Sequence, residues 1–178
     1  PQDYGLNAMI EVPIEMLFLF SSFGIDAAII RFGKQEPEQL ASTFGLLLLI
    51  NGALTLILLL SANLIAQYFK EPRLTLLIQV SALVFILVPF RTIPNALLDM
   101  ELDFKVKAQV ELAAAIISSF VALILAAFGA GVWALIATLL LSAFLRAAFL
   151  AYLRPWIIRP KFQIDPIRAL LKYGLVIM

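Results

Sequence analysis

Five apolar runs dominate this chain of 178 residues, and each exceeds the roughly 20 residues that a helix needs to cross a bilayer. They cover residues 7–30, 40–67, 74–98, 106–128 and 132–153. A sixth run is expected over 165–178, because Asp165 and Pro166 form a typical helix start. Lipid offers the backbone no hydrogen-bonding partners, so each run is predicted to be a helix. The predicted fold is an all-α polytopic membrane helix bundle with five complete transmembrane helices and the start of a sixth.

The composition agrees with lipid as the main solvent, because 63% of the residues are hydrophobic and only 14% are charged. Soluble domains have about 45–50% apolar and about 25% charged residues. The formal net charge of +1 gives no reason to expect nucleic acid as a partner. The chain contains neither Cys nor His, which excludes thiolate nucleophiles and Cys–metal sites and removes the commonest general base. No metal or cofactor is predicted.

Basic residues are distributed unequally between the two sides of the predicted bundle. Only Lys70 and Arg73 lie on the side that holds residues 1–6, 68–73 and 129–131. Nine lie in the links on the other side: Arg31, Lys34, Lys105, Lys107, Arg154, Arg159, Lys161, Arg168 and Lys172. Cytoplasmic links carry an excess of Lys and Arg, so the N-terminal stub is predicted to lie outside. Because the chain starts there with Pro1 rather than Met, an upstream helix is also expected.

The first run contains three acids in the stretch "EVPIEMLFLFSSFGID", which has no cation. At about 100° per residue, one narrow stripe of a single helix holds Glu11, Glu15, Ser22 and Asp26. A carboxylate that faces lipid near the bilayer centre costs at least about 2.5–3.5 kcal/mol. The stripe is therefore predicted to face a polar cavity, with Asp26 as a proton- or Na⁺-coupling site or as the partner of a deep arginine. The alternative for Glu11 is that its side chain reaches the headgroups.

The later runs also have polar faces, which favour a polar cavity between the helices over a bundle sealed by lipid. These faces carry Asn51 and Thr55; Ser81, Arg91, Thr92, Asn95 and Asp99; Lys107, Glu111 and Ser118; and Thr138, Ser142 and Arg146. Structural alternatives remain open for the charged members. Lys107 and Glu111 can form an ordinary pair on a helix surface. Arg146 can snorkel to the interface, and Arg91 and Asp26 can belong to ion pairs within the bundle.

Five short motifs resemble a known family when taken in order. They are "PQDYG" at the start, "FGIDAAIIR" (23–31), "NALLDMELDFK" (95–105), "GAGVWAL" (129–135) and "PWIIRPKF" (155–162). Together they resemble the links and helix ends of bacterial oligosaccharide flippases and polysaccharide biosynthesis transporters. These proteins belong to the multidrug/oligosaccharidyl-lipid/polysaccharide exporter superfamily. The resemblance implies that the chain is helices two to six, and the start of seven, in the N-terminal lobe of a two-lobed transporter.

The resemblance also implies a function. Such a transporter of the bacterial inner membrane would move a lipid-diphosphate-linked oligosaccharide from the cytoplasmic to the outer leaflet by alternating access. Its partners would be the bilayer, the missing second lobe of the same chain and polysaccharide polymerase machinery. The sequence departs from the family pattern at Glu11 and Glu15, where apolar residues are expected, so the resemblance gives these acids no role.

These observations lead to two groups of candidate residues. Arg91 and Arg146, with Asn95 and Lys107, are expected to contact the anionic part of the substrate, since a guanidinium can bind phosphate oxygens in a bidentate manner. The expected cavity or coupling residues are Asp26, Glu15, Glu11 and Glu111. One alternative is a multidrug exporter that binds organic cations in an acidic cavity. A membrane glycosyltransferase or ligase is a further alternative, although no residues here form the catalytic site of an enzyme.

Overall fold

The computed structural model describes residues 2–22, 24–33, 36–153 and 159–162, and these residues form helices and no strands. The helices are α1 (Gln2–Ser21), α2 (Ile25–Phe32), α3 (Pro37–Tyr68), α4 (Arg73–Ala82), α5 (Val84–Met100), α6 (Phe104–Ala127) and α7 (Val132–Leu153). Five stretches of the described residues are long and apolar enough to cross a membrane: Gly5–Arg31, Pro37–Tyr68, Arg73–Met100, Phe104–Ala127 and Val132–Leu153. The predicted helical membrane bundle is thus confirmed. The helix predicted over 165–178 lies outside the described residues.

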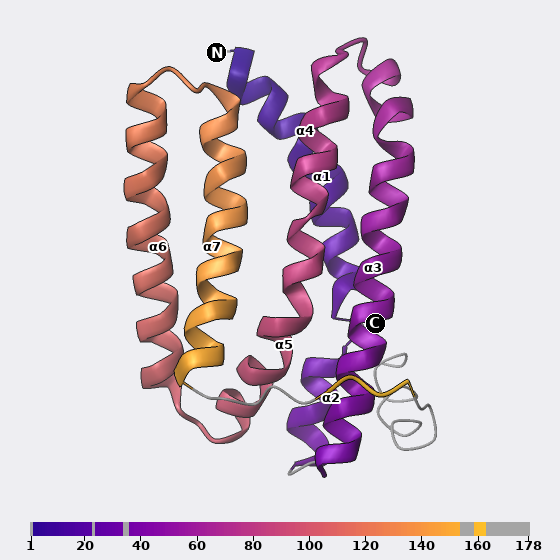
Figure 1. Cartoon of the computed structure of the whole chain (residues 1–178), viewed down its shortest axis with the longest axis vertical. Coiled ribbons are helices and arrows are strands. Elements are labelled where there is room, and N and C mark those ends of the chain that lie inside the picture. The colour runs from indigo at the N-terminus through magenta and orange to yellow at the C-terminus, as the bar shows by residue number, and fades with distance from the viewer. Residues whose placement is uncertain (1, 23, 34–35, 154–158, 163–178) are drawn as a thin grey trace.

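The helices run up and down beside one another (Figure 1). The α6 and α7 helices form one antiparallel pair, and α3 packs along α4 and α5. The α5 helix also contacts α7, and α1 crosses behind α4. The largest cluster of buried apolar side chains joins α1, α3, α4, α5 and α7, with Phe85 at 0% exposure within it. Because α6 buries only Val110, Ala114 and Ser118, most of its surface is apolar and exposed, as expected for a helix that faces lipid.

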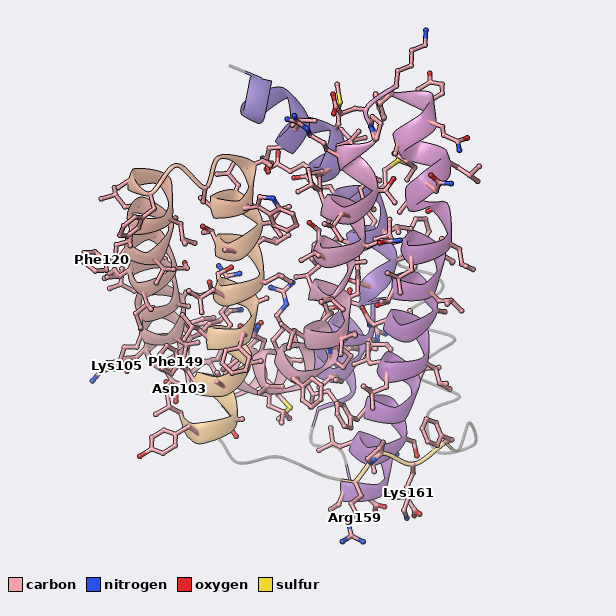
Figure 2. The ribbon with its side chains drawn as sticks, turned by 45° about the horizontal axis from the view of Figure 1, so that its top comes forward. Asp103, Lys105, Phe120, Phe149, Arg159 and Lys161 are labelled. Atoms are coloured by element: carbon pink, nitrogen blue, oxygen red, sulfur yellow. The ribbon has the colours of Figure 1, made fainter. Side chains whose placement is uncertain are left out.

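The described links sort to the two ends of the bundle as the sequence predicts. The α2 helix, the α5–α6 turn and residues 159–162 lie at one end, and the α3–α4 and α6–α7 turns lie at the other (Figure 1). Figure 2 shows Lys105, Arg159 and Lys161 at the first of these ends, which we call the basic end. Four of the nine basic residues counted there lie outside the described residues, namely Lys34, Arg154, Arg168 and Lys172. Which end faces the cytoplasm remains a prediction.

The first membrane span is not the single helix that the sequence suggested over 7–30. It breaks between α1 and α2 at Gly24, which has a left-handed backbone with φ of 64°. Glycine adopts this conformation without a steric penalty, so the chain can change direction there. The break frees carbonyl groups at the end of α1, and the fully buried Asn51 of α3 donates its Nδ2 to the Ser21 carbonyl oxygen at 2.8 Å. A side chain of a neighbouring helix therefore supplies the partner that lipid cannot supply.

The third span, predicted as one helix over 74–98, is likewise divided into α4 and α5 around Leu83. Leu83 keeps a right-handed backbone, and its N–H donates to Val80 O at 3.2 Å in a tighter turn. Thr55 lies one turn after Asn51 on α3. Its Oγ1 lies 2.8 Å from the backbone carbonyl oxygen of Asn51 and 3.5 Å from that of Ala82, the last residue of α4. The same short stretch of α3 thus faces both helix breaks.

Residues 159–162 lie across the first half of α3. The Lys161 backbone N–H donates to Ala41 O at 3.0 Å, and its Nζ lies 2.7 Å from Glu38 Oε1. A side chain at Gly45 would collide with the Lys161 carbonyl group, so this position needs a glycine for the backbones to approach so closely. The contact holds the link after α7 against α3 at the basic end.

We predict that Asn51→Ala destabilises the protein by about 1–2 kcal/mol, because it leaves the Ser21 carbonyl group buried and without its partner. Thermal unfolding of the detergent-solubilised protein measures the change. The matched control is Ser61→Ala on the same helix, whose hydroxyl contacts only Leu58 O of its own helix at 3.4 Å. Equal stability losses in the two variants would contradict the proposed role of Asn51.

Candidate functional site

A cavity of about 430 Å³ opens between α1, α2, α5 and α6 at the level where the first span breaks. We call it the Arg91 pocket. Its lining residues are Phe18, Ser21, Ser22, Asp26, Val88, Arg91, Thr92, Asn95, Ala96, Asp99 and Lys107. The structure therefore brings together four of the candidates from the sequence: Asp26, Arg91, Asn95 and Lys107. Four members of the polar face predicted for this span, Arg91, Thr92, Asn95 and Asp99, line the pocket despite Pro89 and Pro94, whereas the fifth, Ser81, lies on α4 and lines another cavity.

Arg91 is half-buried on α5 and has an aromatic neighbour instead of an acid. Its guanidinium carbon lies 5.7 Å from the centroid of the Phe18 ring, a geometry that favours a cation. Within the described residues, Arg91 forms neither a hydrogen bond nor an ion pair through its side chain. The charges of Arg146 and Glu111 act on it from α7 and α6. Its donors are thus available to a molecule in the pocket.

The other cation of the pocket is already engaged. Lys107 Nζ lies 2.6 Å and 2.8 Å from the two carboxylate oxygens of Asp99, so this pair joins α6 to the end of α5. The sequence left open a pair between Lys107 and Glu111, but Glu111 instead contacts Arg146 on α7. Arg146 Nε lies 2.9 Å from Glu111 Oε2, although the N–H does not point along this line and the contact is an ion pair without a hydrogen bond.

Asp26 and Asn95 complete the polar part of the Arg91 pocket. Asp26 is exposed and stands in the first turn of α2, where an acid interacts favourably with the helix dipole. It forms no ion pair with Arg91 or with another residue in the part of the chain that the structure describes. Asn95 is half-buried, one turn after Arg91 on the same face of α5. Its amide can therefore act beside the guanidinium.

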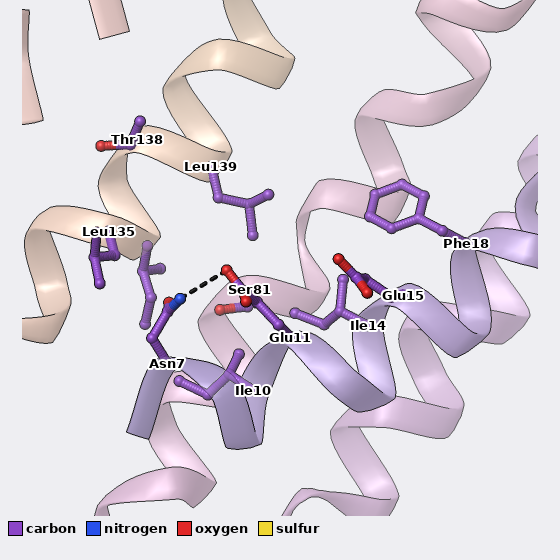
Figure 3. A pocket seen from close by; sticks show the side chains of 11 residues that line it. Asn7, Ile10, Glu11, Ile14, Glu15, Phe18, Ser81, Leu135, Thr138 and Leu139 are labelled. Atoms are coloured by element: carbon purple, nitrogen blue, oxygen red, sulfur yellow. Dashed lines mark hydrogen bonds between the residues drawn. The ribbon is translucent and has the colours of Figure 1, made fainter. Parts of the chain in front are cut away.

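A second cavity, of about 360 Å³, lies between α1, α4 and α7 (Figure 3). We call it the acidic pocket. Its lining residues are Asn7, Ile10, Glu11, Ile14, Glu15, Phe18, Ser81, Leu135, Ile136, Thr138 and Leu139. Asn7 Nδ2 donates to Glu11 Oε1 at 2.7 Å, the bond drawn in Figure 3. Glu11 and Glu15 thus border a cavity between helices, and both side chains are exposed.

The stripe of acids is divided between the two pockets. Glu11 and Glu15 border the acidic pocket, whereas Ser22 and Asp26 border the Arg91 pocket. The boundary is Phe18, which lines both cavities and packs on Phe85 with ring centroids 4.8 Å apart. A single aromatic ring therefore lines both the acidic pocket and the pocket of Arg91, which has no ion pair with any described residue.

Comparison with known proteins agrees with this membrane architecture. Residues 1–178, the whole chain, match the family described as polysaccharide biosynthesis protein. The chain belongs to this family. It is 24% identical over 178 residues to the succinoglycan biosynthesis transport protein ExoT of Rhizobium meliloti (strain 1021), and it spans 36% of the length of that protein. No solved structure gives a significant match. The five apolar helices and the family together make this chain part of a multi-pass membrane protein.

Phe18 and Asn7 are among the pocket residues that the sequence did not indicate. No sequence pattern indicated the position of Phe18, because a ring that lines two cavities looks like any other apolar residue of its helix. Asn7 was detectable, since it precedes Glu11 by four residues and an amide at that spacing can reach a carboxylate. Arg146, predicted with Arg91 as a substrate contact, does not line the Arg91 pocket, although its charge acts on Arg91 from α7.

We predict that the Arg146–Glu111 pair stabilises the bundle, with a coupling of about 0.5–3 kcal/mol in a double-mutant cycle. Arg146→Leu or Glu111→Leu alone leaves one charge without its partner, so each single variant is expected to lose more stability than the double variant. The control cycle uses Lys161 and Glu38, which lie 2.7 Å apart but are about half exposed at 49% and 53%, and should show almost no coupling. Additive single effects at Arg146 and Glu111 would contradict the prediction.

Proposed function

We propose that this protein is a transporter, and not an enzyme, that moves a lipid-diphosphate-linked oligosaccharide or a similar polysaccharide intermediate. The movement runs from the cytoplasmic to the outer leaflet of the bacterial inner membrane by alternating access. Support comes from the family over the whole chain and from the name of the Rhizobium relative, a transport protein of succinoglycan biosynthesis. Because the chain spans 36% of that relative, the second lobe would come from sequence beyond these residues. We also propose polysaccharide polymerase machinery as a partner.

The observation that carries the proposal is the arginine without an acidic partner in a polar cavity of a membrane protein. A cation at membrane depth is expensive and is usually paired or functional. Lys107 and Arg146 each have an acid within 2.9 Å, whereas Arg91 has none within the described residues. The Arg91 pocket can therefore accept an anionic group at Arg91 without first breaking an ion pair.

The chemistry of the pocket suits a diphosphate. The guanidinium of Arg91 stays charged at any relevant pH and presents two parallel N–H donors to phosphate oxygens. Asn95, one turn away on α5, adds a neutral donor for a phosphate or sugar oxygen. Lys107 would contribute its charge while Asp99 holds it in position. Asp26, at the edge of the pocket, would repel an anion that sits too close to α2 and so restrict its position.

The alternatives have weaker support. A multidrug exporter could use the carboxylates of Glu11 and Glu15 for organic cations, but the family and the relative concern polysaccharide biosynthesis. A glycosyltransferase or ligase needs catalytic acids in an extended loop, and the described links between the helices are short turns.

We predict that Arg91→Ala lowers polysaccharide export at least about tenfold, the loss expected when one charged hydrogen-bonding partner is removed. The measurement is export by a strain that lacks its own transporter, with membrane protein levels checked for each variant. Arg91→Lys keeps the charge but loses the bidentate geometry, and it should be nearly as defective as Ala if this geometry matters. Arg73→Ala is the matched control, because Arg73 is 80% exposed at the opposite end. Near-normal export by the Arg91→Ala variant would overturn the proposal.

We also propose that the basic end of the bundle faces the cytoplasm, on the basis of nine basic residues against two in the sequence. The chain has no native Cys, so single cysteines can serve as probes. In intact cells, Ala130→Cys in the α6–α7 turn should react with an impermeant thiol reagent, and Phe162→Cys should react only after lysis. The reverse pattern would show that the opposite end faces the cytoplasm.

A further inference from the structure

The acidic pocket contains negative charge without a compensating positive charge. Glu11 and Glu15 stand one turn apart on α1, and two like charges at this spacing destabilise a helix. The residues that line the pocket include no Lys or Arg. Among the described residues, Glu11 is bonded only to the neutral amide of Asn7, and Glu15 has no hydrogen bond or ion pair. In a membrane span such charge requires a counter-charge or protonation.

A buried hydroxyl group in the same pocket is also without a partner. Ser81 of α4 lines the cavity at 0% exposure, and its Oγ has no hydrogen-bond partner within the described residues. Serines in helices commonly satisfy their hydroxyl on a carbonyl of the preceding turn, as Thr138 does here with Ala134 O at 2.7 Å. An unsatisfied buried hydroxyl costs free energy, so a ligand or an ordered water that reached this group would stabilise it.

The donor atoms of the acidic pocket are all oxygens on its polar side. They belong to two carboxylates, the Ser81 and Thr138 hydroxyls and the Asn7 amide, whose nitrogen is already used by Glu11. Carboxylate, hydroxyl and carbonyl oxygens are the ligands that hard cations such as the alkali and alkaline-earth ions prefer. No group of three or more acidic, His or Cys residues suited to a metal ion occurs in the described residues. The donor set therefore fits a weakly bound monovalent ion that keeps some of its water better than a tightly caged divalent ion.

We propose that the acidic pocket between α1, α4 and α7 binds Na⁺ through Glu11, Glu15 and the Ser81 hydroxyl. The site is separate from the Arg91 pocket, so it goes beyond the proposed transport of an anionic intermediate and does not depend on it. The cavity of about 360 Å³ has room for the ion and several waters. The carboxylates supply the charge, and Ser81 supplies an oxygen at the buried wall.

The test is equilibrium binding of radioactive Na⁺ to the purified protein encoded by the complete gene, with choline chloride holding the ionic strength constant. Wild type is expected to bind Na⁺ saturably. The Glu11→Gln, Glu15→Gln double variant keeps the shape of both side chains but removes their charge, and its affinity should fall at least about tenfold. The matched control is Glu71→Gln in the α3–α4 turn, which removes an acid at the same end of the bundle and should bind Na⁺ like wild type.

Ser81→Ala separates a ligand role from a purely structural role. In choline alone, this variant should unfold at the same temperature as wild type or a higher one, because it removes a buried hydroxyl group that has no partner. Added Na⁺ should then raise its unfolding temperature less than that of wild type, since stabilisation by a ligand follows its affinity. Absence of saturable Na⁺ binding, or equal binding by the double variant and wild type, would overturn the proposal. Equal stabilisation of Ser81→Ala and wild type by Na⁺ would remove Ser81 from the site.

Discussion

The hydrogen bond that Asn51 of α3 donates to the end of α1 stabilises a bundle whose helices are interrupted within the membrane spans. Lipid cannot satisfy the carbonyl groups that a break exposes, so each break needs a polar partner from a neighbouring helix. Asn51 donates to Ser21 O at the end of α1, whereas the Thr55 hydroxyl donates to Asn51 O at 2.8 Å and lies 3.5 Å from Ala82 O at the end of α4. The first break lets α2 pack against α5, so Asp26 lines the same pocket as Arg91.

Charge within the bundle follows the same rule of local compensation. Lys107 and Asp99 join α6 to α5, and Arg146 and Glu111 join α7 to α6, so four of the charges serve as internal ties. Arg91 on one side of Phe18, and Glu11 and Glu15 on the other, have no such ties within the described residues. Phe18 lines both cavities, and Asp26, which also lacks an ion pair within the described residues, shares the Arg91 pocket with Arg91.

The sequence was sufficient for the membrane spans because a bilayer imposes a length and an apolar composition that are visible residue by residue. It was not sufficient for the breaks. Gly24 is one of several glycines in the chain, and only its left-handed φ of 64° distinguishes it from a glycine that continues a helix. Asn51 gave a weak signal as a lone amide in an apolar helix. Its partner, 30 residues earlier in the chain, depends on tertiary packing that no local pattern encodes.

The same limit explains what could be predicted of the candidate site. Helical periodicity placed Arg91 and Asn95 on one face, because both lie within α5 and the nearby prolines do not move them to different faces. Helical periodicity did not predict the relative positions of residues on either side of a helix break, nor which acid each cation pairs with. Glu11 and Asp26 lie on the same face only if one continuous helix holds both, and the first span is divided at Gly24. Lys107 pairs with Asp99 of α5 and not with Glu111 of its own helix. A polar face therefore indicates that a cavity exists, whereas the pairing of its charges is decided by how the neighbouring helices pack. Within the described residues that packing pairs Lys107 and Arg146 with acids and leaves Arg91 without an acidic partner.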